Sequence, residues 1–241
     1  MFPLKDNIPT LHFPVVTVTL IAFCVIAYFI LQEGRLGLPE DGGGDWPVNI
    51  YALIPCELSG DGDCVTAPGG PSPATTVLTS MFMHGSILHL GGNMLFLWIF
   101  GNNVEDSMGP VKFVLFYLLG GVAASALQIA VDPASNIPNL GASGAVAGVL
   151  GGYLLLFPRA RVITVIFIIF FFTIVELPAL LILGFWFVQQ ILFGYFDLNS
   201  AGAGGGVAYF AHIGGFAFGM LAIKLFADER KQRGQMGRAR S

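Results

Sequence analysis

The chain has 241 residues, of which 55% are hydrophobic and only 11% are charged, with a formal net charge of −4. Soluble domains carry about 25% charged residues, so this composition excludes an ordinary soluble protein. Several stretches reach the ~20 apolar residues that cross a hydrocarbon core. The chain is therefore interpreted as a polytopic helical membrane protein, and we expect no nucleic-acid partner.

Six transmembrane helices are expected in a single membrane domain that covers residues 1–241. The first could be a signal peptide, but its apolar run exceeds the usual ~7–15 residues and "FILQEG" offers no small-residue cleavage site, so we interpret it as retained. The expected fold class is all-α, a bundle of six transmembrane helices. Their expected bounds are about 13–31, 81–100, 111–131, 141–157, 177–194 and 206–226.

A long outer loop, about 33–77, follows the first helix and is rich in glycine, proline and acidic residues. Cys56 and Cys64 both lie in it, on the side expected to be oxidising. We therefore expect a disulfide between them. Cys24 lies in the middle of a helix and is interpreted as a small hydrophobic residue.

The longest apolar segment, Val162 to Gly194, could cross the membrane once or twice. A single crossing places ten of the 11 lysine and arginine residues on one side and only Arg35 on the other. Positive residues gather on the cytoplasmic side, so one crossing is favoured, with both termini in the cytosol. The basic tail 227–241 is then cytosolic, and its composition suggests disorder.

The break within this segment is expected near "VELPAL". Glu176 is costly at a bilayer centre, and Pro178 suits the first turn of a helix. Residues 162–175 are therefore expected to lie along the inner interface or dip into it. A kinked continuous helix is the alternative.

The polar residues inside the membrane are few, and such residues are functional candidates. His84, His89 and Asn93 lie on the second helix, Ser143 begins the fourth, and His212 lies on the sixth. These three helices run in the same direction, so their polar residues lie at a similar depth. His89 and Asn93 are four residues apart and share a face, whereas His84 points elsewhere and is expected to be structural.

Small residues recur at helical spacing on the fourth and sixth helices. Such stripes let helix backbones approach closely in lipid. We therefore expect these two helices to pack tightly and bring Ser143 to His212. The stripes consist of Gly144, Gly148 and Gly151 on the fourth helix and Ala208, His212, Gly215 and Gly219 on the sixth.

This set of side chains is suited to nucleophilic catalysis. A serine needs a base, and His212 can take the proton of Ser143. Attack on an amide creates an oxyanion, for which His89, Asn93 and the backbone N–H of Ser143 are candidate donors. No carboxylate is expected at this depth, because Asp132 and Asp197 are placed in outer loops. A Ser–His dyad without an orienting acid is therefore expected.

Three segments carry a resemblance to a known family. "HGSILHLGGNMLFLWIFG", "GASGAVAG" and "AHIGGFAFG" resemble, in order and spacing, the rhomboid intramembrane serine proteases, over about Ser80 to Lys224. The resemblance implies that Ser143 is the nucleophile, that His212 is the general base, and that His89 and Asn93 join the Ser143 N–H in the oxyanion hole. It also implies substrates that are single-span proteins of the lipid bilayer, and no metal or cofactor.

Two positions depart from the family pattern. Members often carry a Trp-Arg pair where this chain has Thr75 and Thr76, so the anchoring of that loop must differ. Some members place a tyrosine one turn after the serine, where this chain has Ala147. His212 must therefore be oriented by something else.

Two rivals to a protease remain. A catalytically silent rhomboid-like scaffold or chaperone for membrane helices typically lacks the serine or the histidine. A transporter is disfavoured because internal repeats are absent from the sequence. Short termini without a transit peptide favour a bacterial plasma membrane, with the active site open to the outer face. Substrate is expected to enter beside the fifth helix, near its bulky residues Phe185, Trp186 and Phe187.

Overall fold

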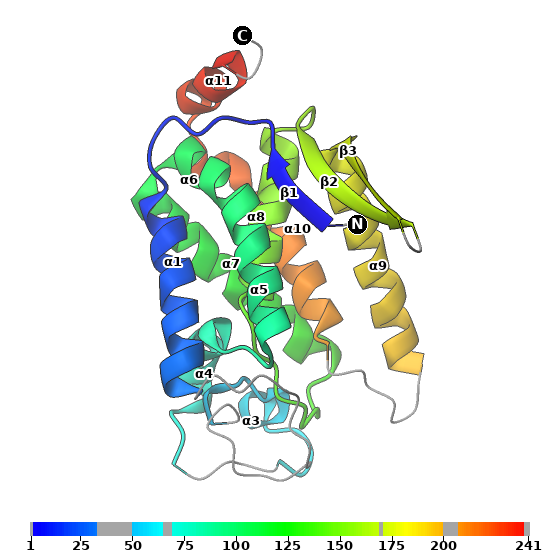
Figure 1. Ribbon diagram of the computed structural model, residues 1–241. Helices are drawn as coiled ribbons and strands as arrows, with labels where there is room; N and C mark the ends of the chain where they lie inside the picture. Colours follow the sequence, from blue (N-terminus) through cyan, green and yellow to red (C-terminus); the bar gives the residue numbers. More distant parts are fainter. Residues whose placement is uncertain (1, 33–49, 65–68, 169–170, 200–206, 239–241) are drawn as a thin grey trace.

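The computed structural model describes residues 2–32, 50–64, 69–168, 171–199 and 207–238, which form a helical bundle with one small sheet (Figure 1). Strand β1 (Phe2–Asp6) and helix α11 (Glu229–Arg238) lie at one end, called here the terminal end. The short helices α3 (Pro55–Ser59) and α4 (Pro73–Thr79) lie at the opposite end, called here the loop end.

Six longer helical segments make up the bundle. Three helices of the described chain, α7, α9 and α10, are long and apolar enough to cross a membrane, and the segment Val15–Leu31 and helix α8 are apolar but shorter. The segments are α1 (Val15–Ile26) with a π-helical turn η1 (Ala27–Leu31), α5 (Ile87–Phe96) with a π-helical turn η3 (Leu97–Gly101) and α6 (Asn102–Met108), α7 (Pro110–Val131), α8 (Ser143–Leu156), α9 (Ala179–Asn199) and α10 (Tyr209–Phe226).

The second helical segment departs from its expected bounds of 81–100. A 3₁₀ turn, η2 (Ser80–Phe82), precedes it, and α5 begins only at Ile87. The reason is local: Ser86 is extended and its side chain accepts a hydrogen bond from His89 N–H, which caps the helix. His84 therefore lies before this helix rather than on it.

The segment before α9 is a β-hairpin, so the expectation of an all-α fold was wrong and the fold is mostly helical. Strands β2 (Arg161–Ile168) and β3 (Phe171–Pro178) pair antiparallel, and β1 adds to β2 in the order β1-β2-β3. Valine, isoleucine, threonine and phenylalanine dominate both hairpin strands, and these residues favour strands. Glu176 therefore lies in β3 opposite Ile163, with Arg161 3.7 Å away, and not at a helix boundary.

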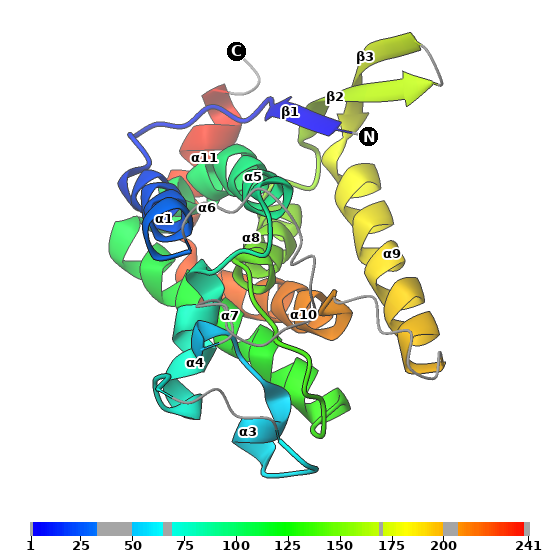
Figure 2. The same ribbon diagram turned by 60° about the horizontal axis from the view of Figure 1, so that its bottom comes forward.

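Helix α8 occupies the interior of the bundle. Twelve of its 14 residues are buried, and Figure 2 shows it among α5, α7 and α10. At about 1.5 Å per residue such a helix is ~21 Å long, shorter than a ~30 Å hydrocarbon core. Helix α8 is therefore too short to cross such a core by itself.

The start of α1 depends on a residue far away in sequence. Its own N-cap, Pro14, offers no side-chain acceptor. Instead the buried Glu105 carboxylate of α6 accepts hydrogen bonds from Val16 N–H (2.9 Å), Thr17 N–H (2.8 Å) and the Thr17 hydroxyl (2.8 Å). An anion at a helix N-terminus stabilises both the free N–H groups and the helix dipole.

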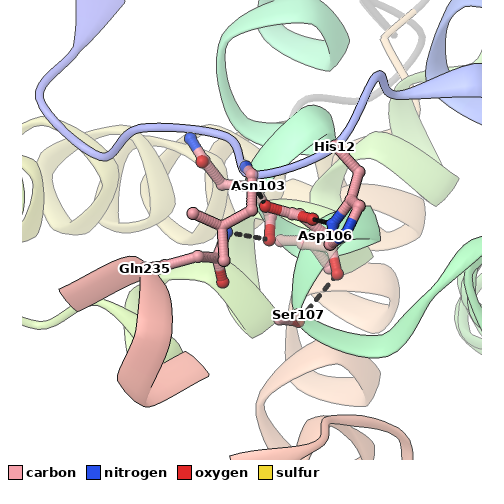
Figure 3. A network of polar contacts seen from close by, with 7 residues as sticks. His12, Asn103, Asp106, Ser107 and Gln235 are labelled. Atoms are coloured by element: carbon pink, nitrogen blue, oxygen red, sulfur yellow. Dashed lines mark hydrogen bonds and ion pairs between the residues drawn. The ribbon is translucent and has the colours of Figure 1, made fainter. Parts of the chain in front are cut away.

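The tail was expected to be disordered, but residues Glu229–Arg238 form helix α11 against the terminal end. Gln235 Nε2 donates to the carbonyl of Asn103 (3.2 Å), beside the contact between His12 Nδ1 and Asp106 Oδ1 (2.7 Å), as Figure 3 shows. Gln232 Nε2 also donates to the carbonyl of Leu156 (2.7 Å). These tertiary contacts order a sequence that is polar on its own.

Candidate active site

The central pair of the site is Ser143 and His212. Ser143 is the first residue of α8, and His212 lies in the first turn of α10, 69 positions later. The Ser143 hydroxyl oxygen lies 2.8 Å from His212 Nε2. This distance allows the hydroxyl proton to pass directly to the imidazole.

Helices α8 and α10 pack with their backbones in direct contact. A Cβ on Gly215 would overlap the carbonyl oxygen of Gly144, and one on Gly219 would overlap that of Gly148. A Cβ on Gly148 would in turn lie 3.3 Å from the carbonyl oxygen of Gly215. The expected tight packing of the two glycine stripes is confirmed, because any side chain there would hold the helices further apart.

The second ring nitrogen of His212 contacts a residue that the sequence analysis missed. Gln190 of α9 is 7% exposed, and its Oε1 lies 2.7 Å from His212 Nδ1. The Trp186 ring packs one turn earlier, with its centroid 5.6 Å from that of the imidazole. The available signal was the polar pair Gln189–Gln190 in an otherwise apolar helix, since polar residues in such helices are functional candidates.

His89 and Asn93 point from α5 toward the same place. The Gly85 N–H donates to His89 Nδ1 (3.4 Å), so the neutral ring carries its proton on Nε2. Gly141 has φ +124°, and a Cβ there would come within 2.7 Å of His89 Nε2. The buried Asn93 Nδ2 has no hydrogen-bond partner among the described residues. Two N–H donors are thus left free beside Ser143.

These residues share one cavity of about 580 Å³. Its wall includes Ala147, one turn after the serine, and Trp186 from α9. Because Ala147 has only a methyl group, the cavity continues past the serine toward Phe96, Val146 and Leu150. The site therefore contains a hydroxyl, an imidazole and N–H donors around a space large enough for a peptide segment.

His84 packs its ring against that of His89, with centroids 5.3 Å apart, and its structural role stays a prediction. Gln32 Nε2 donates to the His84 carbonyl (2.8 Å), and the His84 N–H donates to Gln32 Oε1 (3.0 Å). His84 Nε2 in turn accepts a hydrogen bond from the N–H of Ala142 (3.5 Å), the residue before Ser143. His84 thus connects the end of η1 to the start of α8.

The loop end is held near the site by backbone and sulfur contacts. The structure pairs Cys56 with Cys64 in a disulfide, with Cα atoms 5.8 Å apart. Leu53 and Asn139 exchange backbone hydrogen bonds of 2.9 and 2.7 Å just ahead of Gly141. Residues 33–49 of the expected outer loop, with Arg35, lie outside the described residues.

Asp132 and Asp197 were both expected in outer loops, and this expectation was wrong for Asp197. Asp132 directly follows α7, as a loop residue would, whereas Asp197 lies in the last turn of α9. Within the described ranges, no three histidine, cysteine, aspartate or glutamate residues gather as a metal site would require.

The fold and site define a class: a helical membrane protein with a serine–histidine pair in a cavity. Residues 72–229 match the family model described as the Rhomboid domain, so the chain belongs to the rhomboid family. The resemblance found in the sequence motifs is thereby confirmed.

Three relatives illustrate the similarity. "Rhomboid protein 1, mitochondrial" of Saccharomyces cerevisiae is 32% identical over 170 residues, which cover 66% of this chain and 44% of that protein. "RHOMBOID-like protein 4" of Arabidopsis thaliana is 37% identical over 145 residues, 60% of this chain and 32% of that protein. "Presenilin-associated rhomboid-like protein, mitochondrial" of Mus musculus is 29% identical over 161 residues, 65% and 39% of the two chains.

The chain thus spans less than half the length of these curated relatives. The expected location in a bacterial plasma membrane is contradicted, because the yeast and mouse relatives are named as mitochondrial proteins. That expectation rested on short termini without a transit peptide. The ends of a sequence do not identify the membrane in which a protein lies, and the lysine and arginine distribution indicates orientation only.

Proposed function

We propose that this protein is an intramembrane serine endopeptidase of the rhomboid type, which cleaves single-span membrane proteins in or beside their transmembrane segments. The observation that carries the proposal is the 2.8 Å contact between Ser143 Oγ and His212 Nε2 inside a cavity of about 580 Å³. Family membership supports it. Three groups are required for acyl transfer, namely a nucleophile, a base and oxyanion donors, and the cavity offers a candidate for each.

The first half of the proposed reaction forms an acyl-enzyme. His212 Nε2 takes the proton of Ser143 as its oxygen attacks the carbonyl carbon of the substrate peptide bond. The negative charge that develops on the carbonyl oxygen is met by His89 Nε2–H, Asn93 Nδ2–H and the N–H of Ser143. The last of these groups has no acceptor within its own helix, because it belongs to the first turn of α8.

The second half releases the products. The protonated His212 gives its proton to the departing amine as the peptide C–N bond breaks, which leaves the acyl group on Ser143. Water then attacks the ester with His212 again as base, and the serine is regenerated. The described residues show no carboxylate contact to His212, so the reaction is proposed to use a Ser–His dyad.

The membrane setting follows from the same geometry. We propose that all six helical segments span the bilayer, with α8 as the short central one and Ser143 recessed below the loop end. The outer face of α9 carries exposed apolar residues such as Leu181, Val188 and Leu192, which suit contact with lipid. Of the three bulky residues suggested for substrate entry, Phe185 is exposed, Phe187 stacks on Phe216, and Trp186 reaches the cavity.

The proposal is tested by reconstitution in liposomes with a single-span reporter whose segment near the membrane surface is rich in small residues. Cleavage is compared for the native chain, Ser143→Ala and His212→Ala. The matched control is Ser107→Ala, which removes a serine of α6 that donates only to the carbonyl of Val104. A fluorophosphonate probe, which reacts with activated serines, provides a readout that needs no substrate.

We expect native protein and Ser107→Ala to cleave and to label, and both dyad variants to lose cleavage. Cleavage that survives Ser143→Ala would overturn the assignment of the nucleophile. Native protein that neither cleaves the reporter nor reacts with the probe would overturn the protease proposal. The alternative of a catalytically silent scaffold for membrane helices would then be favoured.

A further inference from the structure

The search for a group that orients His212 leads to helix α9. The sequence offers no carboxylate for this task, and Ala147 is too small for it. Gln190 is the residue in contact: it is nearly buried, and its Oε1 lies 2.7 Å from His212 Nδ1. The contact joins side chains from two different helices. It is made by Nδ1 of the imidazole, whereas Ser143 contacts Nε2.

The orientation of the Gln190 side-chain amide is set by the hydrogen bond that its Nε2 donates. Its Nε2 donates to the carbonyl oxygen of Trp186, one turn earlier in α9, at 3.4 Å. If the amide were flipped, its oxygen would face this carbonyl and two acceptors would oppose each other. The unflipped amide therefore presents an acceptor to His212, and a backbone carbonyl sets this choice.

An acceptor at Nδ1 determines where the imidazole proton lies. In a neutral imidazole one nitrogen donates and the other accepts. With Gln190 Oε1 against it, Nδ1 carries the proton, so Nε2 presents its lone pair to the Ser143 hydroxyl. This is the tautomer that a general base needs. The opposite tautomer would place an N–H against the serine oxygen and could not accept its proton.

The position of Gln190 depends on how α9 packs against α10. Phe187, three residues before it, stacks on Phe216 with ring centroids 4.3 Å apart. Gly194, four residues after it, lies so close that a Cβ there would be 3.2 Å from the ring of Phe210. These contacts lie on one face of α9 on either side of Gln190 and hold its amide at the height of His212.

We propose that Gln190 is the positioning residue of the dyad: it holds His212 in the tautomer and orientation that let Nε2 accept the proton of Ser143. The inference rests on the proposed function. Gln190 acts through His212 and does not touch the reacting atoms. It takes the place that a carboxylate has in a Ser-His-Asp triad, but as a neutral dipole it adds no charge to the site.

The test compares Gln190→Leu, Gln190→Glu and the matched control Gln189→Leu. The control makes the same chemical change one position earlier on α9, where the side chain is half-buried and has no described contact with His212. Values of kcat and KM for reporter cleavage are measured against pH in liposomes, together with thermal unfolding. Among the described residues, the titratable side chain that faces His212 is His89, and it is unchanged in all three variants.

We expect Gln190→Leu to lower kcat about tenfold or more with KM within about twofold, as loss of one hydrogen bond to a catalytic group predicts. Gln189→Leu stays within about twofold of native. Gln190→Glu retains activity, and the acid limb of its kcat profile moves to higher pH, because an anion at Nδ1 stabilises the protonated imidazole. A purely structural role predicts instead that the buried charge of Gln190→Glu is at least as harmful as leucine and that the acid limb does not move.

A second readout does not depend on activity. The ¹⁵N shifts of the imidazole report which nitrogen carries the proton, and His212 is assigned by the signal lost in His212→Ala, among only four histidines in the chain. We expect the Nδ1–H tautomer in the native protein and a mixture of tautomers in Gln190→Leu. An Nε2–H tautomer in the native protein, or no change in the variant, overturns the inference. Failure of the protease itself would show separately, in the fluorophosphonate labelling of native protein.

Discussion

Substitution of Gly215 by alanine perturbs the active site without touching any group that reacts. Gly215 lies on α10, three residues after His212, and a Cβ there would overlap the carbonyl oxygen of Gly144, the residue after the nucleophile. Real Cβ atoms essentially never come within 3.0 Å of another heavy atom, and this Cβ would lie well inside that limit, so α8 and α10 must separate by on the order of 1 Å. The dyad is built across this same contact.

The consequence for catalysis follows from the geometry of the hydrogen bond. The Ser143–His212 distance of 2.8 Å would lengthen to about 3.8 Å, beyond the ~3.2 Å limit of an effective hydrogen bond. A misplacement of about 1 Å costs on the order of 100-fold in rate. Overpacking costs a further ~1–3 kcal/mol in the free energy of unfolding, which is less than typical total stabilities. We therefore expect a folded but nearly inactive protein.

The assay pairs reporter cleavage in liposomes with thermal unfolding and fluorophosphonate labelling. Gly91→Ala on α5 is the matched control, because a Cβ at Gly91 meets nothing within 4 Å. The control should cleave at the native rate and unfold at the native temperature or slightly above, since alanine favours helices over glycine. Near-native cleavage by Gly215→Ala would refute the reasoning that backbone contact between α8 and α10 sets the dyad.

Three further outcomes concern parts of the fold outside the cavity. Glu105→Gln removes the charge that caps α1, and we expect the free energy of unfolding to fall by about 1–2 kcal/mol, with the partly exposed Glu57→Gln near native. Burial raises the pKa of Asp6 from 3.8 to about 6, so the folded state holds this proton more tightly than the unfolded state. The contribution of Asp6 to stability is therefore fully present below about pH 4 and is lost, by up to ~3 kcal/mol, as the pH rises through about 6. Unfolding measured from pH 4 to 7 should show this slope and Asp6→Asn should lose it, whereas the same slope in both proteins would exclude Asp6 as its source. Finally, protein isolated from its own membrane without reductant should show a single free thiol, that of Cys24, and two further thiols in that material would contradict the Cys56–Cys64 pair.

Buried hydrogen bonds join β1 and α11, at the terminal end, to helices of the bundle. Asp6 accepts hydrogen bonds from the Tyr153 hydroxyl (2.6 Å) and Asn103 Nδ2 (2.7 Å), which links β1 to α8 and α6. Gln235 then reaches the carbonyl of the same Asn103 from α11 (3.2 Å). Segments from both ends of the described chain therefore meet on α6.

The sequence by itself determined the membrane class, the rhomboid resemblance and the set of residues that meet in the cavity. Apolar content and helix length are summed properties of a segment, and the spacing of four between His89 and Asn93 is a property of any helix. The glycine stripes could also be interpreted, because only residues without side chains allow Gly215 to pack against the Gly144 backbone. These signals are local, and each depends on one element at a time.

Tertiary structure alone decided the rest. Gln190 is one of two neighbouring glutamines, and only the packing of α9 on α10 selects it over Gln189 as the partner of His212. The hairpin at 161–178 gains its third strand from residues 2–6, at the other end of the chain, and the polar helix α11 is held by carbonyls of α6 and α8. Such pairings join residues 22 (Gln190 and His212), 76 (Leu156 and Gln232) and 132 (Asn103 and Gln235) positions apart, and no pattern within either segment encodes the distance between them.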